Sequence, residues 1–201
     1  MTKWISPLFS DARNALGESV VFSNWKGRTY FRSYVIPANP QTNKQQANRA
    51  VMAALVERWQ DIIDNDDKKG AWNSEALSYT ISGFNLFTKF GMSSQITVPA
   101  TGNTTNPVTI TYTLGLPASK AKIYAYDGST WEDITPAGGL SAGENKTFEH
   151  TFSSTGTYQI FIADGDVLVS GDSAPQEYQA ITMWSRDEAN GTAKAAEIVI
   201  S

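Results

Sequence analysis

The hydrophobic pattern of this 201-residue chain changes its period near residue 95, and that change constrains the fold more than any other feature. Before it, apolar residues recur at helical spacing, as Ala47, Val51, Leu55, Trp59 and Ile62. After it, segments such as 108–114 and 122–126 alternate between apolar and polar residues, as half-buried strands do. We therefore expect an α+β protein in which helices precede a β-rich part.

The helical segment has a clear beginning. Thr42 and Gln45 have the spacing of a capping box, with threonine at the N-cap and glutamine at the third helical position. We therefore place a helix at about 43–63, and a shorter helix that carries Trp72 after it. The aromatic-rich segment 84–90 is expected to be a tail that docks on these helices.

Short strands separated by Gly, Pro, Asn and Asp turns follow from about residue 95. We expect them near 108–114, 122–126, 131–134, 145–152, 157–163, 167–170, 178–185 and 193–200. This spacing predicts a C-terminal antiparallel Ig-like β-sandwich. We therefore divide the chain into an assembly module at 1–94, built of a β-hairpin and a helical hairpin, and a β-sandwich domain at 95–201.

An N-terminal β-hairpin at 20–35 carries an unusual face. Lys26-Gly27 has the composition of its tight turn. The second arm places Arg28, Tyr30, Arg32 and Tyr34 on one face, because every second residue of a strand points the same way. Guanidinium and phenol groups anchor protein interfaces, so we interpret this face as a partner surface. Nucleic-acid binding and coverage by the protein's own helix are the alternatives.

The segment 37–42, which two prolines keep extended, and the first helical turns after it complete the predicted partner interface. Amides and a guanidinium there can grip a neighbouring strand, although bracing of the chain's own cap explains the same residues. The residues that we assign to the interface are Trp25, Lys26, Arg28, Tyr30, Arg32, Tyr34, Asn39, Gln41, Gln45, Gln46 and Arg49.

Composition excludes several kinds of chemistry. The chain has no cysteine and one histidine, His150, which rules out a thiolate nucleophile, a thiolate zinc site and a multi-histidine metal cage. We expect no catalytic residues, no metal and no cofactor. The first residues lack the apolar run of a secretory signal, and no stretch approaches about 20 apolar residues. We therefore expect a protein made in a cytoplasm, with no membrane partner.

Charge is distributed unevenly along the chain, whose net charge is −4. Residues 1–96 hold 11 Lys and Arg against 8 Asp and Glu, or +3, whereas 97–201 hold 5 against 12, or −7. The asymmetry suggests different partners for the two halves, or head-to-tail contact between copies. Two solvated surfaces of opposite bias would give the same numbers. The sequence pI of about 5.0 argues against a dedicated nucleic-acid binder.

Three further features have structural and functional interpretations. Asp164-Gly165-Asp166 reads as a hairpin turn, with calcium binding as the alternative. Glu132-Asp133 beside Trp131 reads as strand packing, with a carbohydrate platform as the alternative. His150 is in register with two phenylalanines, which is typical of a boundary residue and not of a catalytic one.

Several motifs in residues 16–87 recur together in one family. They are Gly17, Val20-Val-Phe22, Lys26-Gly27, Arg32, Asn39-Pro-Gln-Thr42, Gln45-Gln-Ala-Asn-Arg49, Trp72-Asn73 and Gly83-Phe-Asn-Leu-Phe87. This pattern resembles a family of small structural proteins found in phage and prophage-like sequences, and it covers just over a third of the chain. The β-rich part looks like the Ig-like appendages of many phage capsid and tail proteins.

The resemblance implies a non-enzymatic virion structural protein, associated with the capsid, connector or tail. Such a protein would be located in the virion and would act by homo-oligomerisation and by contacts with other virion proteins. Two alternatives remain: a nucleic-acid binder that uses the Arg/Tyr face, and a β-sandwich that binds a glycan or a host surface through Trp131 or Trp184.

Overall fold

The computed structural model describes residues 14–16, 20–25, 28–33 and 41–201, and the chain forms two compact units, 1–40 and 41–201. In the first unit, β1 (Asn14–Leu16), β2 (Val20–Trp25) and β3 (Arg28–Ser33) form an antiparallel sheet in that order. We call it the N-terminal sheet. Its β2–β3 ladder pairs Trp25 with Arg28, as the expected hairpin requires. The expected turn residues, Lys26 and Gly27, lie outside the described residues.

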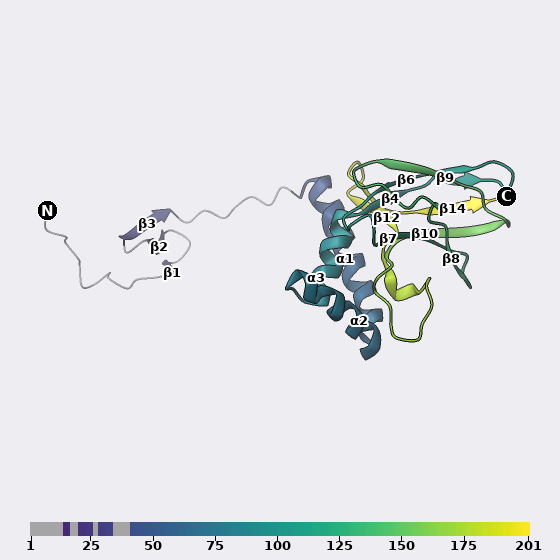
Figure 1. The fold of residues 1–201 in the computed structure, drawn as a ribbon. Helices are drawn as coiled ribbons and strands as arrows, with labels where there is room; N and C mark the ends of the chain where they lie inside the picture. Colours follow the sequence, from purple (N-terminus) through teal and green to yellow (C-terminus); the bar gives the residue numbers. More distant parts are fainter. Residues whose placement is uncertain (1–13, 17–19, 26–27, 34–40) are drawn as a thin grey trace, which may run out of the picture. The chain divides into compact units, whose positions relative to one another are not determined.

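The second unit, which we call the body, begins with helices that lie together on one side of its sheets (Figure 1). They are α1 (Asn43–Ile63), α2 (Asp66–Ala76), the short 3-10 helix η1 (Leu77–Tyr79) and α3 (Gly83–Ser93). The prediction of a helix at 43–63 is confirmed. The segment 84–90 does pack on these helices, as expected, but it is the middle of α3 and not a tail. Ser82 caps that helix by accepting a hydrogen bond from the Asn85 N–H at 3.3 Å.

The strands of the body form two main sheets and one separate hairpin (Figure 1). The smaller sheet has the order β4 (Gln95–Thr97), β6 (Val108–Thr113), β9 (Lys146–His150). The larger has the order β5 (Thr101–Gly102), β14 (Glu197–Ile200), β10 (Gly156–Asp164), β7 (Ala121–Tyr126), β8 (Trp131–Asp133), with β11 (Ala180–Thr182) also paired to β10. The hairpin consists of β12 (Trp184–Asp187) and β13 (Thr192–Ala195). We expected the sheets to be antiparallel throughout, but β14 and β5 pair in parallel.

The two main sheets share a core made by alternate residues of their strands. On β6, Val108, Ile110 and Tyr112 are buried while the threonines between them are more exposed. On β14, Ile198 and Ile200 are buried in the same way. The structure is therefore an α+β fold with sandwich-like sheets, as predicted.

β10 departs from this alternation, since Phe161 and Ala163 are as buried as their neighbours Ile160 and Ile162. The reason is a third layer: the guanidinium carbon of Arg58, on α1, lies 5.1 Å from the Phe161 ring centroid. The outer face of β10 is therefore covered as well, and this strand is buried on both sides.

Helices and sheets belong to one core, so the structure does not divide at the expected 94/95 boundary. Trp72, on α2, donates a hydrogen bond to the carbonyl oxygen of Tyr178 at 2.9 Å. The Ser94 hydroxyl accepts one from the Gly115 N–H at 2.9 Å, directly across that boundary. The boundary between the two compact units lies instead between Pro40 and Gln41 in the sequence.

The segment 167–170 was expected to be a strand, and this prediction is wrong. This segment follows the turn after β10. Its backbone forms a hydrogen bond with a side chain, where a strand would form hydrogen bonds with the backbone of a neighbouring strand. The Val169 N–H donates to the phenol oxygen of Tyr178 at 2.9 Å, and that phenol donates to Asp172 at 2.8 Å. A tyrosine thus supplies the partner that a sheet would have supplied.

Thr42→Ala is expected to lower the free energy of unfolding of the body by about 0.5–1 kcal/mol. The Thr42 hydroxyl caps α1 by accepting a hydrogen bond from the Gln45 N–H. The effect lies at the low end for N-caps because this bond is 3.4 Å long and exposed. Urea denaturation measures it, with Thr42→Ser as the control that keeps the hydroxyl. Equal losses in both variants would contradict the capping role.

Candidate functional site

The predicted Arg/Tyr face is exposed where the structure describes it. Tyr30 is 43% exposed, and Arg32, two residues along β3 and hence on the same face, is exposed as well. β3 is the last strand of the N-terminal sheet. For Trp25 and Arg28 the structure gives only their backbone pairing. The predicted interface residues Lys26, Tyr34 and Asn39 lie outside the described part of the chain.

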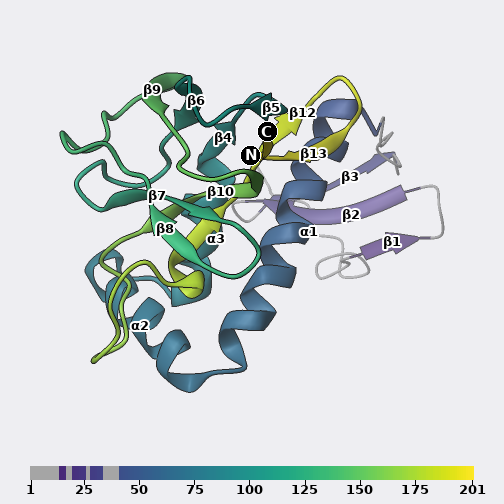
Figure 2. The ribbon, with the colours of Figure 1, turned by 90° about the vertical axis from the view of Figure 1, so that its right-hand side faces the viewer.

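The polar residues at the start of α1 are engaged with their own chain. Gln46 donates through Nε2 to the carbonyl oxygen of Gln41 at 2.9 Å. Asn43 donates through Nδ2 to the carbonyl oxygen of Ala189 at 2.6 Å, and Lys44 pairs with Glu188 at 3.5 Å. These contacts brace α1 to the hairpin of β12 and β13, which lies alongside it (Figure 2). The remaining predicted interface residues in this region, Gln45 and Arg49, are exposed.

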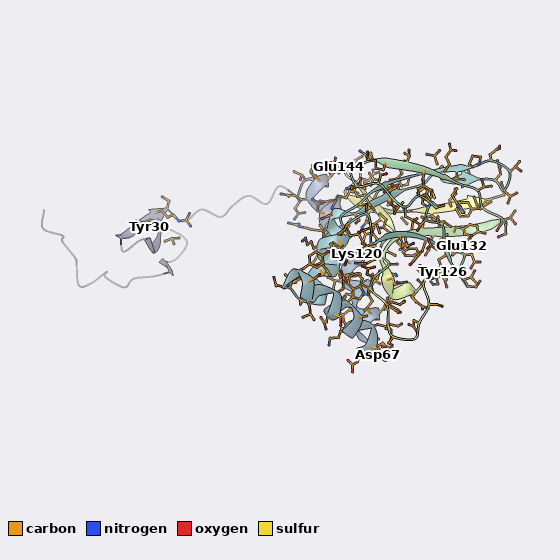
Figure 3. The ribbon with its side chains drawn as sticks, in the orientation of Figure 1. Tyr30, Asp67, Lys120, Tyr126, Glu132 and Glu144 are labelled. Atoms are coloured by element: carbon orange, nitrogen blue, oxygen red, sulfur yellow. The ribbon has the colours of Figure 1, made fainter. Side chains whose placement is uncertain are left out.

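An ionic cluster lies where the helices meet the larger sheet. The ammonium of Lys120 bonds to the carboxylate of Glu75, on α2, and lies 3.1 Å from the Oδ2 of Asp166. Figure 3 shows Lys120 on the side of the sheets that faces the helices. The two carboxylates, with the Glu75 bond the strongest contribution, raise the pKa of Lys120, which stays charged at neutral pH. This cluster joins α2 to the turn after β10.

Asp164 is the buried acid next to this cluster, with no exposed surface. Its Oδ1 accepts a hydrogen bond from the Asp166 N–H at 3.1 Å, as in the predicted turn. Its Oδ2 is buried and has no hydrogen-bond partner among the described residues. Loss of water around the carboxylate raises the pKa of Asp164 to about 6. Among the described residues, no group of three His, Asp or Glu side chains is placed to hold a metal ion.

The two tryptophans considered for glycan binding differ in access. Trp184 is only 4% exposed, so it offers no platform. Trp131 is half-buried and stacks on Tyr126, with ring centroids 4.8 Å apart and planes at 26°. Its ring also lies 4.9 Å from that of Phe161. The aromatic pair of Tyr126 and Trp131 therefore lies at the β8 side of the larger sheet, joined to the core through Phe161.

Two acidic residues, Glu132 and Asp133, follow Trp131 on β8. Glu132 is exposed and forms no ion pair within the described residues, whereas Asp133 pairs with Lys122 at 3.5 Å. Figure 3 shows Tyr126 and Glu132 together at the β8 side of the body. Nearby, His150 packs edge-on against Phe152 at 4.8 Å, and burial lowers the pKa of its imidazole, with the Glu132 carboxylate acting in the opposite direction. His150 is a boundary residue, as its register predicted.

The loop that enters β8 is the predicted hairpin turn at 127–130. Both carboxylate oxygens of Asp127 accept hydrogen bonds from this loop, at 2.6–2.9 Å, from the backbone and the hydroxyls of Ser129 and Thr130. The Thr130 hydroxyl contributes most to lowering the pKa of Asp127. Asp127 is therefore a permanent negative charge, occupied in holding the turn.

Comparison of the chain with protein-family models, with curated protein sequences and with solved structures finds no match. No helix among the described residues is both long enough and apolar enough to cross a bilayer.

Proposed function

We propose that this chain is a non-enzymatic structural subunit of a virus particle, which acts by self-assembly and by contacts with other virion proteins. The observation that carries the proposal is the N-terminal sheet, which belongs to a compact unit separate from the body and its core. The motif resemblance in residues 16–87 supplies the class of particle, and the sheet supplies the means of assembly.

A unit of this size needs a partner surface for physical reasons. Chains of about 40 residues rarely bury enough apolar surface to be stable alone, and a small sheet gains stability when a face is covered. Tyr30 and Arg32 present a phenol and a guanidinium on such a face. Both groups combine a large contact area with directed hydrogen bonds, as residues at the centre of interfaces do.

The purified chain is expected to form multimers whose mass rises with concentration, measured by size-exclusion chromatography with light scattering. The double variant Tyr30→Ala with Arg32→Ala should weaken association by about tenfold or more. Gln60→Ala with Lys69→Ala is the control, because both residues are exposed on the helices of the body. A chain that stays monomeric at every concentration would contradict the proposal.

The same double variant separates assembly from nucleic-acid binding. A nucleic-acid binder would bind DNA or RNA with an affinity that falls steeply as salt increases, and would lose it in the variant. Multimers that form without nucleic acid, and that resist nuclease, support the structural function.

A further inference from the structure

We propose that the N-terminal sheet of one copy docks on strand β8 of the body of a second copy, with Arg32 of the first facing Glu132 of the second. The inference rests on the proposed function, since it names the surface that receives the sheet. Its test separates failure of the docking surface from failure of self-assembly.

The two units carry opposite charge. Residues 1–40 hold 5 Lys and Arg against 2 Asp and Glu, or +3, whereas residues 41–201 hold 11 against 18, or −7. The positively charged unit 1–40 of one copy is therefore attracted to the negatively charged body of another copy. Such complementarity speeds encounter and selects the partner.

Many carboxylates of the body are already engaged. Glu75 and Asp166 hold Lys120, Glu188 holds Lys44, and Asp127 holds its turn. Among the residues that the structure describes, Glu132 has no such ion pair, and it is exposed on β8. An incoming guanidinium therefore meets a carboxylate that does not have to give up an existing cation.

β8 also has a position that suits Arg32. Glu132 pairs with Ala125, whereas Trp131 pairs with Tyr126, so Glu132 and the aromatic pair lie on opposite faces of the sheet, and the guanidinium is the group that meets the acid. β8 is also the last strand of its sheet, as β3 is of the N-terminal sheet. Because β8 has only three residues, backbone pairing adds little, and the side chains must supply most of the affinity.

The contact joins two different surfaces, so it is heterologous. An open assembly therefore has a free N-terminal sheet at one end and a free β8 at the other. Further copies can add at either end, so the assembly closes into a ring or grows as a filament. A contact between two copies can be restored by mixing two different variants. A contact between the N-terminal sheet and the body of the same copy could not be restored in this way.

The test reverses each charge in the full-length chain and measures mass by light scattering. Arg32→Glu alone and Glu132→Arg alone should each weaken assembly by about a hundredfold, because like charges then face each other. The double variant Arg32→Glu with Glu132→Arg should assemble again. Glu144→Arg is the matched control, since Glu144 is another exposed carboxylate without an ion pair among the described residues, and it should leave assembly unchanged.

Mixing then shows whether the contact lies between copies. Equal amounts of Arg32→Glu and Glu132→Arg chains should assemble together, because every contact in an alternating array pairs opposite charges. Arg32→Ala mixed with Glu132→Ala should stop at a dimer of one copy each, because such a pair has one intact contact and no second. Recovery in either mixture also shows that the single variants are folded.

The outcomes are distinct. Loss of assembly in Arg32→Glu without any effect of Glu132→Arg would overturn the β8 surface and leave self-assembly standing. Loss in both single variants without recovery in the double variant or in the mixtures would overturn the pairing of Arg32 with Glu132. A wild-type chain that never associates would overturn this inference together with the proposed function.

Discussion

Trp72→Ala is expected to lower the free energy of unfolding of the body by about 3–5 kcal/mol, the cost of removing a large aromatic side chain from a core. Trp72 has no exposed surface, and its ring packs edge-on against Phe87 with centroids 5.2 Å apart. Its indole N–H also donates to the Tyr178 carbonyl, which would lose this donor. The substitution therefore removes both apolar packing and the bond that ties α2 to the segment before β11.

Two further variants separate these contributions in urea denaturation. Trp72→Phe keeps most of the apolar volume and removes the N–H, so its loss should lie near 1–3 kcal/mol. Leu77→Ala is the surface control, because Leu77 is 76% exposed and its truncation should cost less than about 0.5 kcal/mol. Similar losses for Trp72→Ala and Leu77→Ala would show that the helices are not part of the core.

The same experiment tests where the cooperative unit ends. If residues 41–201 form one core, the helix signal in far-UV circular dichroism and the fluorescence of Trp131 and Trp184, measured in a chain whose other tryptophans are replaced by phenylalanine, should follow one transition. A helical module that ended near residue 94 would unfold separately. We expect coincident transitions, because Arg58 bonds to the carbonyl oxygens of Glu177 and Ala180 and so ties α1 to the sheet layer.

Sequence patterns predicted those elements whose signals are local. Thr42 and the apolar stripe of α1 lie within one helix, so the cap and the periodicity placed 43–63 correctly. The strict alternation of β6 and the Asp127 turn before β8 are local in the same sense. α3 was missed because its glycine and aromatic residues are weak helix formers, and packing on Trp59 and Trp72 overrides that preference.

Features that depend on distant residues could not be predicted in this way. Phe161 is buried because Arg58, 103 positions earlier, lies across it, and no window of sequence contains both residues. Glu75 and Lys120 are likewise separated by 45 positions. The turn at Asp164 was predicted correctly, yet its burial beneath the helical layer was not, because a turn composition normally indicates exposure.

Asp164→Asn is expected to stabilise the body at neutral pH and to have little effect near pH 4. Burial raises the pKa of Asp164 from 3.8 to about 6, so the folded chain holds a proton there more tightly than the unfolded chain does. The stability from this proton is fully present below pH 3.8 and is lost as pH rises through about 6. The difference corresponds to about 3 kcal/mol, because each tenfold change in proton affinity is worth about 1.4 kcal/mol.

The comparison isolates one carboxyl because both chains share every other titrating group. Burial is the largest effect on the pKa of Asp164 and raises it. The hydrogen bond from the Asp166 N–H and the charge of Lys120 favour the charged form, whereas the carboxylates of Glu75 and Asp166 oppose it. Asparagine keeps the oxygen that accepts from the Asp166 N–H and carries no charge at any pH. Denaturation at pH 4, 5, 6, 7 and 8 should therefore show a stability difference that grows to about pH 7 and then levels off. A difference that shrinks with rising pH would mean that Lys120 pairs with Asp164 strongly enough to reverse the effect of burial.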